Sequence, residues 1–201
     1  VGLLVGKITR RSPFDGYTDP EKNKSVIMKD VFTQGDSFFN TGDLVRDIGF
    51  RHAQFVDRLG DTYRWKGENV STTEVENAVS EYEKIAEAVV YGVEIPNTNG
   101  RAGMAAITLA DHAEFTQQDL QQMATEFKKC LPAYAVPVFL RIQVHVETTG
   151  TFKYQKNKLK EQAFDPNKTD ERLLVLLPNA TEYCDLTAEI FNNIQAYQYR
   201  F

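Results

Sequence analysis

The sequence predicts an α+β fold, in which a strand-rich first part precedes a small, mostly antiparallel sheet flanked by helices. Three observations support this class. Short apolar runs broken by turn residues fill residues 1–56. Apolar residues recur at helical spacing after residues 71 and 116, and residues 140–146 alternate between apolar and polar as a strand does. At 201 residues the chain can bury a core, as one ordinary domain or as two small ones.

The first part is predicted to consist of short strands and loops. Residues 2–8 read as one strand. Residues 25–33 alternate weakly and fit either a helix or a linker. The apolar segment that begins at residue 38 is expected to end in a turn at Thr41-Gly42-Asp43, and residues 53–56 then resume as a strand.

The pattern changes at residue 62. Residues 62–66 set β-branched and aromatic side chains between charges, which favours a strand. Two overlapping capping boxes, Ser71 with Glu74 and Thr73 with Glu76, indicate a helix start. Apolar residues then follow at helical spacing, at Val75, Ala78, Val79 and Tyr82.

Strands and a second helix are expected next. Residues 86–93 and 104–109 favour strands, and Gly100-Arg101-Ala102-Gly103 favours a turn, because the context of a dinucleotide-binding loop is absent. Thr116 is a good N-cap for a helix that ends at Leu131-Pro132. Residues 140–146 form the clearest strand of the chain.

The last part is predicted to add one strand and one helix. Residues 173–177 form an apolar run of strand length. Thr187 is the expected cap of the helix, whose apolar side is formed by Ile190, Phe191, Ile194 and Tyr197.

Composition excludes several classes of function. The net charge of -5 argues against a nucleic-acid partner. Cys130 and Cys184 are too few for a disulfide framework, which favours a reducing compartment. The three histidines have no Cys or carboxylate neighbours at metal-ligand spacing, so no structural zinc or other metal site is expected. The chain shows no signal peptide and begins at Val1 inside a strand pattern, so we expect it to be a piece of something longer.

Four segments carry the candidate chemistry, and each has an ordinary structural explanation when taken alone. Thr41-Gly42-Asp43 fits a turn in which Asp bonds its own backbone. Asp57-Arg58 fits a surface ion pair. Lys66-Gly67-Glu68-Asn69 fits a tight turn after a strand, with Gly67 supplying a positive φ. Lys153, which follows Thr149-Gly150-Thr151-Phe152, fits a solvated basic face that also includes Lys156, Lys158 and Lys160.

In this order the segments resemble the late motifs of the acyl-adenylate-forming (AMP-binding) enzymes. The sequence of residues 64–69 is most similar to that of the fatty acid transport protein branch, the very-long-chain acyl-CoA synthetases. The resemblance spans most of residues 1–165. It implies that residues 1–58 are the C-terminal end of the large AMP-binding domain and residues 59–165 the small, mobile C-terminal domain, with residues 166–201 as a tail.

The resemblance also implies roles for individual residues. Asp43 would accept hydrogen bonds from the ribose hydroxyls of the nucleotide. Arg58, at the boundary between the two domains, would contact the same ribose. Gly60 would be the hinge residue, where many relatives carry Asp or Lys. Lys153 would be the catalytic lysine of adenylation. Phe152 stands where glycine is common, which leaves Lys156 as an alternative for this lysine.

The turn formed by Lys66, Gly67 and Glu68 would serve the second half-reaction, with Gly67 letting backbone approach the pantetheine arm of CoA. Tyr63 and Trp65 beside it would pack against substrate or in the core. Burial in the core is favoured, because large aromatic side chains mostly bury.

The function implied is the C-terminal part of a long-chain or very-long-chain fatty acyl-CoA ligase, linked to fatty acid uptake. Such a ligase uses ATP and Mg²⁺ to adenylate the acid and then forms a thioester with CoA. This sequence has no Gly-rich phosphate-binding loop. The resemblance places that loop and the acyl tunnel in an N-terminal adenylation domain ahead of Val1, so this chain alone is expected to be inactive and to bind no cofactor.

Two alternatives stay open. The chain could be a noncatalytic binding or regulatory module that keeps the fold, or part of another adenylate-forming ligase with a different acyl pocket. The resemblance further implies a cytosolic-facing protein associated with the endoplasmic reticulum or the plasma membrane. No apolar run in the sequence reaches the roughly 18 to 20 residues that span a bilayer.

Overall fold

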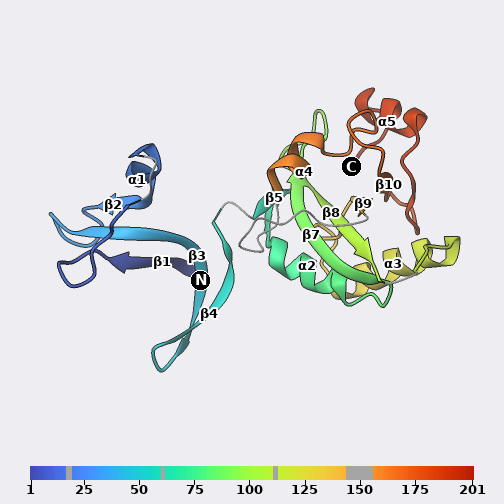
Figure 1. The fold of residues 1–201 in the computed structure, drawn as a ribbon. Coiled ribbons are helices and arrows are strands. Elements are labelled where there is room, and N and C mark those ends of the chain that lie inside the picture. Colours follow the sequence, from blue (N-terminus) through green and yellow to red (C-terminus); the bar gives the residue numbers. More distant parts are fainter. Residues whose placement is uncertain (17–19, 60–61, 111–112, 144–155) are drawn as a thin grey trace. The chain divides into compact units, whose positions relative to one another are not determined.

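The computed structural model of the chain describes residues 1–201 apart from 17–19, 60–61, 111–112 and 144–155 (Figure 1). The chain divides into two compact units, Val1–Gly60 and Asp61–Phe201. Strands dominate the first unit, whereas the second combines a sheet with helices. The predicted α+β class is therefore confirmed.

The first unit is built around one long strand. β3 (Ser37–Gly49) pairs antiparallel with β1 (Gly2–Lys7) and β2 (Ile27–Lys29), and also with β4 (His52–Arg58). The short helix α1 (Pro20–Val26) leads directly into β2. Residues 25–33, for which the sequence favoured a helix or a linker, thus contain the end of α1 and the whole of β2.

The predicted turn at Thr41-Gly42-Asp43 is wrong, because β3 continues through it. The local features of a turn are nevertheless present in this segment. Gly42 has φ +76°, and the Thr41 hydroxyl accepts a hydrogen bond from the Asp43 amide at 3.1 Å. The same hydroxyl donates to the Leu4 carbonyl at 2.7 Å, which ties the segment to β1. Strand partners on either side therefore keep the segment extended, and the turn chemistry survives as a bend within a strand.

The second unit contains a five-stranded sheet in the order β11-β10-β9-β8-β7. Its members are β7 (Ile85–Val93), β8 (Ala102–Leu109), β9 (Phe139–Gln143), β10 (Arg172–Val175) and β11 (Cys184–Asp185). Only β8 and β9 run parallel, and α3 (Gln117–Cys130) lies between them in sequence, as a parallel pair requires. The sheet is mostly antiparallel, as predicted.

Helix starts follow the capping signals in the sequence. Ser71 caps α2 (Thr72–Ser80) by accepting a hydrogen bond from the Glu74 amide at 3.3 Å, so the first of the two overlapping boxes marks the start. Thr116 caps α3, where Asp119 completes a reciprocal capping box. Because such caps depend only on neighbours in sequence, they can be read before the structure is known.

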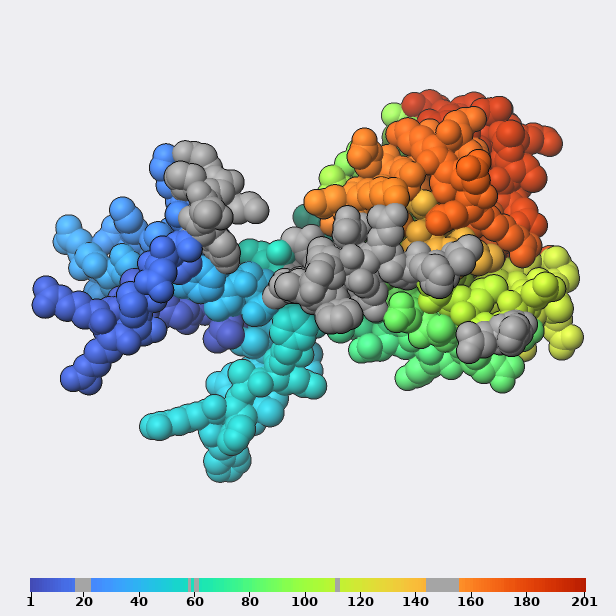
Figure 2. Space-filling view, in the orientation of Figure 1, coloured from blue at the N-terminus to red at the C-terminus, as the bar shows by residue number. Residues whose placement is uncertain are grey.

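Residues 166–201 are part of the second unit and are not a separate appendage. β10 pairs with β9, β11 pairs with β10, and the buried Tyr183 hydroxyl donates to the Pro137 carbonyl at 2.6 Å. In Figure 2, α4 (Lys156–Gln162, orange) and these last residues (red) form one continuous surface. This arrangement shows that the tail helps to complete the core.

The last helix begins as predicted but ends earlier. Thr187 caps α5 (Ala188–Gln195), and Ile194 lies in the core. Tyr197, expected on the apolar side, follows the end of the helix with φ +61° and is 56% exposed. The helical spacing therefore extended two residues beyond the helix itself.

Strand β9 is buried on both faces despite its alternating sequence. Arg141 and Gln143 are buried, as Leu140 is. The Arg141 guanidinium forms an ion pair with Glu171, and the side-chain amide of Gln143 donates to the same carboxylate at 3.1 Å. Charged and polar side chains remain at this central position because Glu171 supplies their partner.

Candidate functional site

A two-stranded hairpin carries the turn that the sequence singled out. β5 (Tyr63–Trp65) pairs with β6 (Glu68–Val70), and Trp65 lies opposite Glu68. Lys66 and Gly67 connect the strands, with φ of 51° and 88°. Two consecutive positive φ values define a type I′ turn, whose twist matches that of the flanking strands. The structure therefore has the tight turn, and the positive φ at Gly67, that the sequence predicts.

The hairpin has a buried aromatic base and an exposed tip. Tyr63 is 5% exposed and Trp65 is 3% exposed, so both lie in the core, as the sequence favoured. Lys66 and Glu68 are exposed. The Lys66 ammonium lies 5.8 Å from the centroid of the Trp65 ring, a cation–π distance. The turn therefore exposes its backbone and the Lys66 ammonium, while the buried rings of Tyr63 and Trp65 anchor the hairpin in the core.

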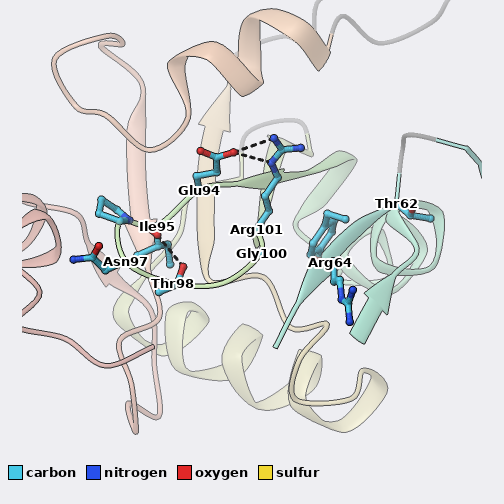
Figure 3. Close-up of a pocket in the computed structure, with 10 residues that line it drawn as sticks. Thr62, Arg64, Glu94, Ile95, Asn97, Thr98, Gly100 and Arg101 are labelled. Carbon is cyan, nitrogen blue, oxygen red and sulfur yellow. Dashed lines mark hydrogen bonds and ion pairs between the residues drawn. The ribbon is translucent and has the colours of Figure 1, made fainter. Parts of the chain in front are cut away.

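A cavity of about 740 Å³ lies beside the hairpin (Figure 3). Arg101 points toward Glu94, and their side chains form an ion pair at 2.9 Å, whereas Arg64 points away from them. The lining residues are Thr62, Tyr63, Arg64, Glu94, Ile95, Pro96, Asn97, Thr98, Gly100 and Arg101. The lining thus holds two arginines and one glutamate, and the net positive charge that remains suits an anionic ligand.

A second cavity of about 470 Å³ lies at the turn itself. Lys66 and Trp65 form part of its wall, and Tyr199 and Arg200 form another part. The end of the chain therefore contributes a cation and an aromatic ring next to the turn. No motif in the sequence indicated this neighbourhood, because the two segments are more than 130 residues apart.

In the first unit the structure brings Asp43 and Arg58 together. They are direct partners in the β3–β4 ladder, and a further hydrogen bond from the Leu59 amide to the Gly42 carbonyl extends that pairing. The ordinary alternative was a surface ion pair between Arg58 and its neighbour Asp57, but Asp57 is buried and does not lie at the surface. This pairing is one of backbone positions, and the side chain of Arg58 lies outside the described part of the structure.

Two of the predicted site residues, Gly60 and Lys153, lie outside the described residues. The alternative lysine, Lys156, is the first residue of α4. Its ammonium lies 3.0 Å from a Glu76 carboxylate oxygen and 3.3 Å from the Thr72 hydroxyl, and its side chain is 15% exposed. The same Glu76 oxygen accepts a hydrogen bond from the Val90 amide at 2.9 Å. Lys156 is therefore engaged in joining α4 to α2 and β7.

Within the described ranges, no group of three or more His, Cys, Asp or Glu side chains is placed to hold a metal ion. Among the helices of the same residues, none is long and apolar enough to cross a membrane.

Comparison with known proteins identifies the family. Residues 74–153 match the AMP-binding enzyme C-terminal domain. A medium/long-chain-fatty-acid–CoA ligase, FadD6 of Mycobacterium tuberculosis, is 47% identical over 89% of the chain, and long-chain fatty acid transport protein 6 of Mus musculus is 44% identical over 97% of it. The chain belongs to the AMP-binding enzymes. It spans only 29% and 31% of the lengths of these two relatives.

Solved structures of AMP-binding enzymes share the fold of the chain. An ATP-bound RpMatB-BxBclM chimera has a TM-score of 0.65 at 26% identity, with 80% of this chain and 31% of that one covered. A fatty acyl CoA synthetase of Mycobacterium tuberculosis has a TM-score of 0.51 at 25% identity, with 72% and 26% covered. The resemblance read from the motifs to the fatty acid transport proteins and acyl-CoA synthetases is thus confirmed.

The left-handed turn residue Gly67 gives a direct test of the hairpin. A side chain there would meet no atom within 4 Å, so only the backbone conformation opposes it. We expect Gly67→Val to lower the free energy of unfolding by about 1–2 kcal/mol, and Gly67→Asn to lower it less, because Asn tolerates positive φ. Urea denaturation, followed by the fluorescence of Trp65, the single tryptophan, measures both. Gly2→Val, at an open position in β1, is the control. Equal losses for Asn and Val would contradict the assigned cause.

Proposed function

We propose that this chain is the C-terminal part of a long-chain fatty acyl-CoA ligase, which adenylates a fatty acid with ATP and then transfers the acyl group to CoA. The observation that carries the proposal is the 47% identity to a fatty acid–CoA ligase over 89% of the chain. The similarity to a long-chain fatty acid transport protein supports a role in fatty acid uptake at a membrane.

The adenylation half-reaction needs the nucleotide to be held and the charge on the α-phosphate to be neutralised. We assign the ribose to Asp43 and Arg58, whose pairing in the β3–β4 ladder supports a shared site. A carboxylate accepts two hydroxyl donors, and charge-assisted hydrogen bonds are strong. We assign to Lys153 the neutralisation of the charge on the α-phosphate. Lys156 has a structural role instead, through its ion pair with Glu76. Mg²⁺ belongs with the triphosphate of ATP, and no residue of this chain is assigned to it.

The thioester half-reaction needs CoA to reach the acyl-adenylate. We assign the approach of the pantetheine arm to the turn of Lys66, Gly67 and Glu68, because the side-chain-free Gly67 leaves open space around the backbone. Cations lie near this turn, with Arg64 on one cavity and Lys66 and Arg200 on the other, while Arg101 is paired with Glu94. Their charge suits the phosphates of CoA.

The two half-reactions are assigned to different orientations of the second unit. We propose that residues 1–58 end the large domain, that Gly60 is the hinge, and that residues 59–165 with the tail 166–201 rotate as the small domain. The boundary between the compact units at Gly60 and Asp61 supports this position for the hinge.

Lys153 provides a test of the first step. In the full-length enzyme, Lys153→Ala should lower acyl-AMP formation by about 10²- to 10³-fold, the usual effect of one electrostatic donor. Thioester formation from supplied acyl-AMP should persist. Lys160→Ala, which removes an exposed lysine of α4, is the control. An equal loss of both steps would refute the assignment, and a loss confined to Lys156→Ala would move the role to Lys156.

Asp43 and Arg58 provide a test of nucleotide binding. Asp43→Ala and Arg58→Ala should each raise the KM for ATP, because each removes a partner of the ribose, while circular dichroism of the folded protein stays unchanged. Isothermal titration with a nonhydrolysable ATP analogue measures the affinity directly. Variants that unfold the protein but bind nucleotide normally in the folded fraction would show that both residues serve only the β3–β4 ladder.

Gly60 provides a test of the rotation. Proline fixes φ near -65° and removes a backbone donor, so Gly60→Pro should trap one orientation of the small domain. We expect acyl-AMP formation to persist and thioester formation to be lost, because the second step needs Gly67 at the acyl-adenylate. Single-turnover measurements of each step separate the two. A correctly folded Gly60→Pro enzyme that performs both steps at normal rates would place the hinge elsewhere.

A further inference from the structure

The hairpin is held against the sheet by a pair of glycines. Gly92 of β7 and Gly103 of β8 are direct partners in the antiparallel ladder. A Cβ added at Gly92 would lie 2.6 Å from the Tyr63 Cβ, and one added at Gly103 would lie 2.3 Å from the Tyr63 hydroxyl oxygen. Such distances are far below van der Waals contact, so the Tyr63 side chain occupies the space that two side chains would fill. We call this space the glycine slot.

Shape, and not hydrogen bonding, holds Tyr63 in the glycine slot. Its ring is buried, and its hydroxyl oxygen has no hydrogen-bond partner among the described residues. Burial raises the pKa of the phenol, so the group stays neutral. A buried hydroxyl without a partner adds no net stability, and the position of the ring therefore depends on how closely it fits the glycines.

A third glycine holds the next residue of the hairpin. Gly100 has φ +94°, and a Cβ there would lie 2.2 Å from the Arg64 carbonyl oxygen. Gly100 also forms an isolated bridge with Trp65, and the Arg101 amide donates to the Arg64 carbonyl at 2.7 Å. The three residues of β5 are thus held one after another, and the Lys66–Gly67 turn follows them directly.

We propose that Gly92, Gly100 and Gly103 are positioning residues for the thioester half-reaction, which set the place of the Lys66–Gly67 turn through β5. The proposal rests on the role assigned above to that turn. A two-stranded hairpin of three-residue strands is not stable alone, so its place depends on what it packs against. The turn begins one residue after Trp65, so a displacement of β5 is passed to the turn.

The test uses a compensating pair of variants in the full-length enzyme. Gly103→Ala places a methyl group against the Tyr63 hydroxyl and should displace β5, which lowers thioester formation from supplied acyl-AMP by about 10- to 100-fold, as expected for a reacting group shifted by about 1 Å. Acyl-AMP formation should stay within about twofold of wild type, since that step does not use the turn. Tyr63→Phe removes the oxygen that this methyl group would meet. The double variant should recover most of the thioester rate.

Two further measurements separate positioning from stability. Hydrogen exchange at the Arg101 amide reports whether β5 stays in place, and it should accelerate in Gly103→Ala while amides of the β7–β8 ladder stay protected. Gly6→Ala, at an open position in β1, is the control and should change nothing. If Gly103→Ala does not fold, Tyr63→Leu, which shortens the side chain in the glycine slot, should give the same selective loss of thioester formation.

The outcomes are distinct. Parallel loss of both half-reactions without recovery in the double variant would show that the glycine slot serves stability alone and would overturn the proposal. Normal thioester formation in Gly103→Ala and in Tyr63→Leu would overturn it as well. A wild-type enzyme that forms neither acyl-AMP nor thioester would refute the proposed function, and the positioning role with it.

Discussion

The antiparallel pairing of β7 with β8 is the contact on which the second unit depends. Most residues of both strands are buried. β9 extends the sheet from β8, the Glu76 side chain of α2 binds the Val90 amide of β7, and β5 packs on the glycines at their far end. One ladder therefore supplies a core strand for the sheet, a helix contact and the support of the hairpin. Burial of apolar surface by this pair stabilises the unit.

Features that depend on nearest neighbours could be predicted from the sequence. The caps at Ser71, Thr116 and Thr187 each start the helix that their side chains indicated. The turn at Gly67 could also be predicted from the sequence, because a glycine that follows a short strand favours a tight turn. In these places the local preference and the final structure agree, which is typical of sequences that fold to one state.

Features that depend on distant partners could not be predicted. Thr41-Gly42-Asp43 has the composition of a turn, yet β1 and β4 hold it in a strand. Lys156 and Glu76 are 80 residues apart, and nothing in either neighbourhood indicates their ion pair. The pairing of Asp43 with Arg58 also depends on the register of two strands, and a shift of one residue would have separated them. The motifs suggested candidate residues through their resemblance to a family, but the spatial relation between those residues needed the fold.

Tyr199 and Arg200 line the same cavity as Lys66, although they belong to no motif. Evolution can therefore alter the immediate surroundings of the turn by changing the end of the chain and leave every signature residue intact. Two family members with identical motifs need not present the same surface around the Lys66–Gly67 turn.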